Sequence, residues 1–241
     1  MRRLIGDRRA RRSEGLFVVE GPRAIDEAVA AGLEFEEQFV PADRPDTAVA
    51  AAGPARLLGP GVFERVAPTQ HPRPPIAIVR QRSPDVDRVL TGASLVLVLD
   101  RIADPGNLGT IIRSAEAAGA DAVVVTPESV DPSNPKVVRS AAGSLFRLPV
   151  IEATLGDVAA AGLVSWGTTS HDEHAPTDYD RADLTGRVAF VLGTEAHGLP
   201  AEAEHDIDRW LRIPHVGPAE SLNVAMAATV LVFEAQRQRR R

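Results

Sequence analysis

Short apolar runs separated by polar turns fill the first third of the chain. Predicted strands there are Leu16–Val19, Gln38–Val40, Ala55–Leu58 and Ile76–Val79. Between the first two, residues 23–31 have apolar side chains at helical spacing, and Gly32 ends that helix. The polar stretch after the last strand contains Ser83-Pro84-Asp85, which is typical of a linker. We predict a small α/β domain over residues 1–82 and a linker over residues 83–93.

From residue 94 onward, strands and helices alternate regularly. Predicted strands are Leu95–Leu99, Ala122–Val125, Leu148–Ile151, Leu163–Thr168, Arg187–Leu192 and Trp210–Ile213. Predicted helices are Leu108–Ala118, Lys136–Ala142, Leu155–Ala161 and Ser221–Gln238. This alternation predicts βαβ units, and therefore an α/β domain with a mostly parallel sheet over residues 94–241.

Composition excludes several classes of protein. Hydrophobic residues make up 44% and charged residues 25% of the chain, which is the balance of a globular rather than a disordered protein. No apolar run approaches the roughly 20 residues that span a membrane, and the basic N-terminus lacks the apolar stretch of a secretory signal. The absence of cysteine excludes disulfides and thiolate metal sites, and it fits a cytoplasmic protein.

Charge is unevenly distributed along the chain. The net charge is −6, yet residues 2–12 contain six arginines and the last five residues contain four. These basic ends either contact a nucleic-acid phosphate backbone or are frayed and solvated, and the sequence leaves both interpretations open.

Candidate chemistry is expected at one edge of the predicted sheet, because ligands of open parallel sheets bind beyond the carboxyl ends of the strands. The loops selected by this rule follow Leu99, Thr168, Leu192 and Ile213. Asparagine is scarce, with three residues in the chain, and Asn107 and Asn223 both follow selected strands.

The first selected loop contains Asp-Pro-Gly-Asn. Pro105-Gly106 predicts a turn, and Asn107 follows it. Arg113 comes six residues after Asn107, at the margin of the apolar stripe of the next helix. Taken alone, this loop is explained by Asn107 as a helix N-cap and by Arg113 as a solvated residue.

The second selected loop is rich in glycine and contains one carboxylate. Gly193 and Gly198 have the spacing of a phosphate loop, but Leu199-Pro200 replaces the lysine and hydroxyl that such a loop requires. Glu195 would repel a triphosphate, and no dinucleotide fingerprint follows a strand. The loop therefore suits a small polar or positively charged ligand.

The third selected loop leads into the last helix. Ser221 lies where an N-cap is expected, and simple capping would explain it. Capping by Ser221 does not explain Asn223, a rare residue type in the first turn of an otherwise apolar helix.

Together the three loops carry ordered motifs. They read D-x-x-x-D-P-G-N-x-G-x-x-x-R from Asp100, L-G-x-E-x-x-G-L from Leu192 and I-P-x-x-G-x-x-x-S-L-N-V-A from Ile213. In this order, each after a predicted strand, they resemble the three motifs of the SpoU/TrmH family of RNA ribose 2′-O-methyltransferases in the SPOUT superfamily. The resemblance covers about residues 95–238. Residues 17–33 are similar to the small RNA-substrate-binding domain that many members carry.

The resemblance implies an enzyme that methylates a ribose 2′-hydroxyl of RNA with S-adenosylmethionine and releases S-adenosylhomocysteine, without a metal. It also implies a trefoil knot in the catalytic domain and a homodimer. Ribosomal RNA is favoured by analogy, because of the accessory domain. Transfer RNA remains an alternative substrate, and a catalytically inactive RNA-binding member remains an alternative function.

Residue roles follow by matching positions. Gly193, Ile213 and Leu222 match the residues that hold the methyl donor, and Thr168 joins them because it ends a selected strand. The predicted catalytic set is Asn107, Arg113, Glu195, Ser221 and Asn223. The presence of all five disfavours an inactive member.

The role of Arg113 stays open within the catalytic set. It matches the arginine proposed to act on the 2′-hydroxyl. Because a guanidinium keeps its proton in proteins, a bidentate phosphate contact is the alternative.

Other conspicuous residues have simpler explanations. His171 and His174 lack the spacing of a metal site and are interpreted as part of a solvated loop, and His197 and His215 as loop surface. The two tryptophans, Trp166 and Trp210, are expected in the core. A helical stripe is interpreted as core or dimer interface and comprises Leu222, Ala225, Met226, Thr229 and Phe233.

Overall fold

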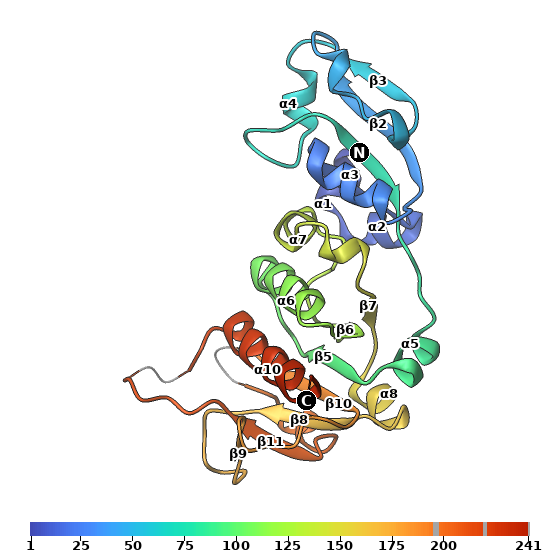
Figure 1. The fold of residues 1–241 in the computed structure, drawn as a ribbon. Helices are drawn as coiled ribbons and strands as arrows, with labels where there is room; N and C mark the ends of the chain where they lie inside the picture. Colours follow the sequence, from blue (N-terminus) through green and yellow to red (C-terminus); the bar gives the residue numbers. More distant parts are fainter. Residues whose placement is uncertain (195–197, 219–220, 241) are drawn as a thin grey trace. The chain divides into compact units, whose positions relative to one another are not determined.

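The computed structural model describes residues 1–194, 198–218 and 221–240. Its contacts divide the chain into two compact units (Figure 1). The first unit comprises Met1–Ser83 and Asp131–Arg147, and the second comprises Pro84–Val130 and Leu148–Arg241.

The first unit is built around a four-stranded sheet in the order β1-β4-β2-β3. Its strands are β1 (Leu16–Glu20), β2 (Phe35–Pro41), β3 (Ala55–Leu58) and β4 (Ile76–Arg80). Its helices are α1 (Arg2–Gly6), α2 (Arg8–Glu14), α3 (Pro22–Ala30), α4 (Val62–Val66) and α7 (Pro135–Ala141), with 3-10 turns at Pro45–Thr47, Ala50–Ala52 and Ser144–Phe146. β4 lies antiparallel to β1 and β2, whereas β2 and β3 are parallel.

The basic N-terminus is helical, so the interpretation as a frayed end is wrong for residues 2–14. Leu4 and Ala10 are buried against the sheet, which gives both helices an apolar anchor. Arg11 is also buried: its guanidinium donates to Asp131 at 2.6 Å and to the carbonyl of Leu4 at 2.8 Å. A local pattern could not predict this, because the partner carboxylate lies 120 residues away.

Residues 131–147 belong to the first unit although they lie between two strands of the second. Val138 and Phe146 join the same buried cluster as Phe17 and Ile25. Arg147 forms an ion pair with Glu27, which adds a polar attachment at the end of the segment. The contacts thus assign to the first unit a segment that the sequence places well inside the catalytic region.

The second unit contains a seven-stranded sheet in the order β7-β6-β5-β10-β8-β11-β9. Its strands are β5 (Leu95–Leu99), β6 (Ala122–Val125), β7 (Val150–Glu152), β8 (Val164–Thr168), β9 (Thr177–Asp178), β10 (Val188–Leu192) and β11 (Arg209–Arg212). Its helices are α5 (Val86–Gly92), α6 (Pro105–Ala117), α8 (Leu155–Ala160), α9 (Ala201–Glu204) and α10 (Val224–Arg239). All pairings among these described strands are parallel, so the predicted α/β class with a mostly parallel sheet is confirmed.

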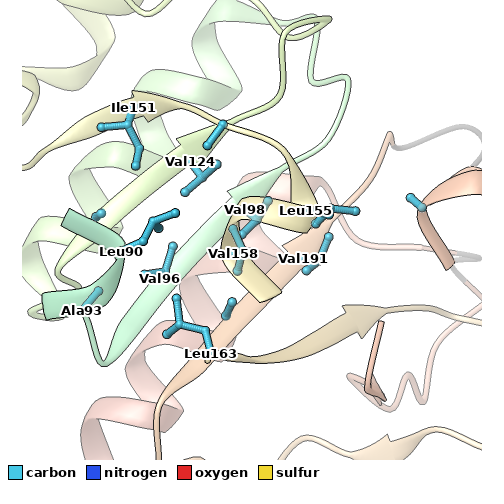
Figure 2. Close-up of a cluster of buried hydrophobic side chains, with 14 of the residues drawn as sticks. Leu90, Ala93, Val96, Val98, Val124, Ile151, Leu155, Val158, Leu163 and Val191 are labelled. Atoms are coloured by element: carbon cyan, nitrogen blue, oxygen red, sulfur yellow. The ribbon is translucent and has the colours of Figure 1, made fainter. Parts of the chain in front are cut away.

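The core of this unit lies on the central strands. Figure 2 shows part of it, including Val98 of β5 and Val191 of β10, which belong to one cluster with Val158 of α8. Leu90 of α5 is buried in the same cluster. The prediction of a linker over residues 83–93 missed α5, which Asp85 caps by accepting a hydrogen bond from a backbone N–H.

Among the described residues, no helix has the length and apolar character needed to cross a bilayer.

Candidate active site

A cavity of about 480 Å³ opens at the carboxyl ends of β8, β10 and β11 in the second unit. This is the edge at which the strand-end rule places ligands. Five of the predicted site residues line it: Thr168, Gly193, Ile213, Ser221 and Leu222. They come from three segments of the chain, and the fold brings them to one space.

Gly193 forms a tight part of the cavity wall. The loop after it is closed by two backbone hydrogen bonds between Thr194 and Gly198, at 3.0 and 2.9 Å. A Cβ placed on Gly193 would lie 2.2 Å from the carbonyl oxygen of Gly198, which is far inside contact distance. Only glycine therefore permits this closure. Glu195, predicted in the catalytic set, and His197 lie outside the described residues.

The first motif opens α6, and the structure corrects two local expectations there. Pro105 and Gly106 are the first residues of the helix rather than a separate turn. Asp104, not Asn107, is the N-cap, and its carboxylate accepts from the backbone N–H of Asn107 at 2.8 Å. Proline at the first helical position needs no N–H partner, which explains the early start.

The third motif opens α10, and Asn223 is its N-cap. The Asn223 side-chain oxygen accepts from the backbone N–H groups of Ala225 at 3.0 Å and Met226 at 3.4 Å. The interpretation of Ser221 as the cap is therefore wrong, and the helix begins at Val224 rather than at Ser221. Ser221 is exposed and lines the cavity instead.

The first and third motifs meet through their asparagines. The amide nitrogen of Asn223 donates to the side-chain oxygen of Asn107 at 3.1 Å. Two turns further along, the hydroxyls of Ser114 and Thr229 are 2.7 Å apart, so α6 and α10 are joined at two levels. Two of the three asparagines in the chain are thus in direct contact across 116 residues.

Arg113 is exposed on α6, directly before Ser114. Within the described part of the chain, no hydrogen bond or ion pair joins its guanidinium to another residue, and it does not line the cavity. A charged side chain that is exposed in this way is available to an external partner. Among the described members of the predicted catalytic set, no hydrogen bond joins Arg113 to Asn107, Ser221 or Asn223.

Asp100 ends β5 beside the glycine loop, and its backbone N–H donates to Leu192 at 2.9 Å. The residue is buried, and burial raises the pKa of its carboxyl above the ordinary value. A hydrogen bond from Thr126 opposes this rise, as does the nearby charge of Arg101. In the sequence, Asp100 is the first residue of the first motif, and the pattern around it does not predict its burial.

Sequence reasoning also missed one wall of the cavity, formed by residues 169–174 together with Glu204 and Trp210. Trp166 is buried as predicted. Trp210 packs against the core cluster as expected but is only partly buried, because its ring also stacks on His174 at the cavity. His174 is partly buried too, which corrects its interpretation as part of a solvated loop. The signal that could have found this wall is the strand-end rule, which had selected the loop after Thr168.

The predicted stripe on the last helix does not form one buried face. Ala225 is buried, and Thr229 bonds to α6, but Met226 and Phe233 are 64% and 41% exposed. Among the described residues, no group of three or more His, Asp or Glu side chains could hold a metal ion.

Comparison with known proteins decides the family. Residues 94–233 match the family model described as the SpoU rRNA Methylase family. The chain belongs to this family. Residues 2–77 of this SpoU methylase also match the model of an MRM3-like substrate binding domain.

Relatives of this SpoU methylase are similar over nearly the whole chain. One is the Bacillus subtilis protein named 23S rRNA (guanosine(2553)-2′-O)-methyltransferase RlmP, 33% identical over 94% of this chain and 90% of its own. Another is the Streptomyces viridochromogenes 23S rRNA (uridine(2479)-2′-O)-methyltransferase, 34% identical over 98% of this chain and 88% of its own.

A solved structure of the SpoU methyltransferase AviRb from Streptomyces viridochromogenes, in complex with the cofactor AdoMet, superimposes with a TM-score of 0.87. It is 31% identical and covers 99% of this chain and 96% of its own. An AdoMet-bound rRNA methyltransferase from Sinorhizobium meliloti has a TM-score of 0.84 and 29% identity, over 98% of this chain and 92% of its own.

Proposed function

We propose that this chain transfers a methyl group from S-adenosylmethionine to a ribose 2′-oxygen of ribosomal RNA. The family supports methyl transfer, and relatives similar over at least nine-tenths of this chain are named for 2′-O-methylation of 23S rRNA. Two structural neighbours contain AdoMet. The observation in this chain that carries the proposal is the cavity where residues of the second and third motifs meet.

The cavity fits the methyl donor in size and in chemistry. Its volume lies within the roughly 300–1,000 Å³ range of small-molecule sites. Backbone at Gly193 and Ile213, the hydroxyl of Thr168 and the side chain of Leu222 offer polar and apolar contacts together. The missing side chain of Gly193 lets Gly198 pack against it and so shapes this part of the cavity wall. We propose these four residues as the donor-binding set.

For methyl transfer, the main task of the protein is to align the donor with the ribose. The bound donor supplies a methyl group already activated by the positive sulfonium, so the protein must orient the ribose and help the hydroxyl proton to leave. We assign Asn107 and Asn223 to the ordering of the site, since their hydrogen bond joins its two helices. Ser221 and Glu195 complete the proposed catalytic set, Ser221 from the cavity wall.

Arg113 is the proposed RNA contact of the catalytic set. Its guanidinium is exposed, and a guanidinium can bind a phosphate through two parallel hydrogen bonds. This contact would fix the nucleotide whose ribose reacts. Replacement by alanine should lower methyl transfer by orders of magnitude while the affinity for S-adenosylhomocysteine stays unchanged, because Arg113 does not line the cavity.

The test measures both quantities on Arg113→Ala and on a control, Arg88→Ala. Arg88 is an exposed arginine on α5 of the second unit that does not line the cavity. Calorimetry gives the affinity for S-adenosylhomocysteine, and a filter assay gives methyl transfer from labelled donor to ribosomal RNA. A wild-type chain that binds no S-adenosylhomocysteine, or an Arg113→Ala chain with full turnover, would contradict the assignment.

Assembly and domain roles complete the proposal. We propose that the first unit binds the RNA substrate and that the second unit carries out catalysis; the match of residues 2–77 to a substrate-binding domain supports the first assignment. The catalytic domain has the trefoil knot of its family and forms a cytoplasmic homodimer. Exposed Met226 and Phe233 on α10 supply apolar surface for that dimer, and light scattering at micromolar concentration tests it.

A further inference from the structure

The cavity wall formed by residues 169–174 has no part in the reaction described so far. It follows β8 directly, and Thr169, His171 and His174 are among its residues that line the cavity. Figure 1 shows this segment between β8 and β9. A wall without helix or strand of its own needs attachments, because otherwise it could not define the shape of a ligand site.

Two polar attachments hold the segment to β11, and a third holds β9 (Thr177–Asp178), which follows the segment. The backbone N–H of Thr169 donates to the carbonyl of Leu211 at 3.0 Å. The guanidinium of Arg212 donates to Asp172 at 2.5 Å and to Asp178 at 2.6 Å. The hydrogen bond from Arg212 lowers the pKa of Asp178, so this carboxylate stays ionised at neutral pH. The segment is therefore attached to β11 at Thr169 and Asp172, and β9 beyond it is attached at Asp178.

The last residue of the wall, His174, is held by a ring contact. The imidazole of His174 lies on the indole of Trp210, with ring centroids 3.9 Å apart and planes inclined by 9°. The indole itself is fixed from the other side: a Cβ on Gly167 would come within 2.8 Å of it, so β8 makes room for the ring by carrying glycine there. His174 thus rests on a rigid platform that is part of the same cavity.

A second contact of His174 is weaker. Its Nε2 atom lies 3.7 Å from a carboxylate oxygen of Glu204, beyond hydrogen-bond distance, and both side chains are partly exposed. Exposed ion pairs at such separations contribute little, whereas stacked rings at contact distance add to the stability of a fixed arrangement. The stacking contact, rather than the charge, is the one that can set the position of the wall.

We propose that His174 is a positioning residue for the methyl donor: its ring, stacked on Trp210, holds the wall at residues 169–174 in the place that closes the donor cavity. This inference rests on the proposed function, since it takes the cavity ligand to be the donor. Loss of the stack should weaken donor binding and leave the chemical step and RNA binding unaffected.

The test compares His174→Ala with His174→Phe, which keeps a flat ring without a charge. The control is His205→Ala, an exposed histidine of the second unit that does not line the cavity. Because one ring contact is removed, we expect His174→Ala to raise the Kd of S-adenosylhomocysteine and the KM of the donor about tenfold. The kcat at saturating donor and the KM for RNA should stay at the wild-type values. His174→Phe should bind within about twofold of wild type if the ring is what matters.

Two results would overturn the inference: donor affinity unchanged in His174→Ala, or His174→Phe as weak as His174→Ala. A melting curve for each variant shows that it is folded. Failure of the proposed function is distinguishable, because then the wild-type chain itself would not bind S-adenosylhomocysteine.

A spectroscopic readout needs no activity. The chain has two tryptophans, so Trp166→Phe leaves Trp210 as the single reporter. In that background, His174→Ala should shift Trp210 emission to the red, because the indole loses its cover, and His174→Phe should restore it. Emission that is identical in all three chains would show that the stack does not exist in solution.

Discussion

The side chain of Asn223 has a structural role and a proposed functional role, and two substitutions can separate them. Its oxygen caps α10, and its nitrogen donates to Asn107 on α6. Serine at position 223 keeps an oxygen for the cap but is too short to reach Asn107, whereas alanine removes both interactions. The pair Asn223→Ser and Asn223→Ala therefore isolates the contact between the two motifs.

The magnitudes follow from the geometry. Replacing an N-cap by alanine costs about 1 kcal/mol, and serine is as good a cap as asparagine. The amide contact of Asn223 with Asn107 joins two partly solvated side chains, so it contributes about 0.5 kcal/mol, at the low end for hydrogen bonds. We expect Asn223→Ala to lose about 1.5 kcal/mol of unfolding free energy and Asn223→Ser about 0.5 kcal/mol.

The two variants should differ in stability but not in the rate of methyl transfer. If the asparagine contact orders the site, both variants lose the same large part of kcat, although one of them is nearly as stable as wild type. Urea unfolding gives the stabilities, and single-turnover methylation gives the rates. Asn223→Ser with wild-type turnover would refute the reasoning and reduce Asn223 to a helix cap.

Three further predictions concern other parts of the fold. Gly193→Ala places a methyl group 2.2 Å from a backbone oxygen, so calorimetry should show at least about tenfold weaker binding of S-adenosylhomocysteine, while Gly186→Ala, with open space around it, should bind normally. Asp131→Ala leaves its buried arginine partner with an uncompensated charge, so urea unfolding should show a loss of about 3–5 kcal/mol. Thr154→Ala removes a capping box and should cost about 1 kcal/mol at neutral pH. Hydrogen bonds from Thr154 lower the pKa of Asp157, so the stability from that carboxylate is full above its unfolded pKa and is lost as the pH falls through its folded pKa. The difference in unfolding free energy between Thr154→Ala and wild type should therefore become smaller at acidic pH.

The strands of the second unit could be predicted closely because their burial is continuous. All five residues of β5 and of β10 are buried, and a run such as Leu95–Leu99 has few other stable places in a globular domain. Helix α10 was predicted from the helical spacing of its apolar residues, with its start three residues too early.

Local sequence patterns did not predict the structure of segments that depend on a residue far away in the chain. The helices at the N-terminus depend on Arg11 and Asp131, which only the tertiary fold brings together. The cap of α10 depends on which of two polar residues, Ser221 or Asn223, has the right backbone conformation, and residue types cannot show this. Helix α5 within the predicted linker was missed because the residue types around Leu90 are polar, and only the tertiary fold shows that Leu90 joins a core cluster.

At the candidate site, motifs predicted more than periodicity did. They identified Gly193, Ile213, Ser221 and Leu222, and the strand-end rule added Thr168; these five residues share one cavity. The wall at residues 169–174 was missed because its cohesion comes from rings and ion pairs to β11, not from any pattern within it.

The most direct test of the central claim is to map the product. Ribosomal RNA from a strain that lacks this protein is incubated with the purified chain and labelled methyl donor, and the methylated nucleotide is located by ribose-sensitive cleavage. The account predicts label on the 2′-oxygen of one ribose, and loss of that label with Arg113→Ala. Label on a base, or no transfer by a chain that binds the donor, would contradict it.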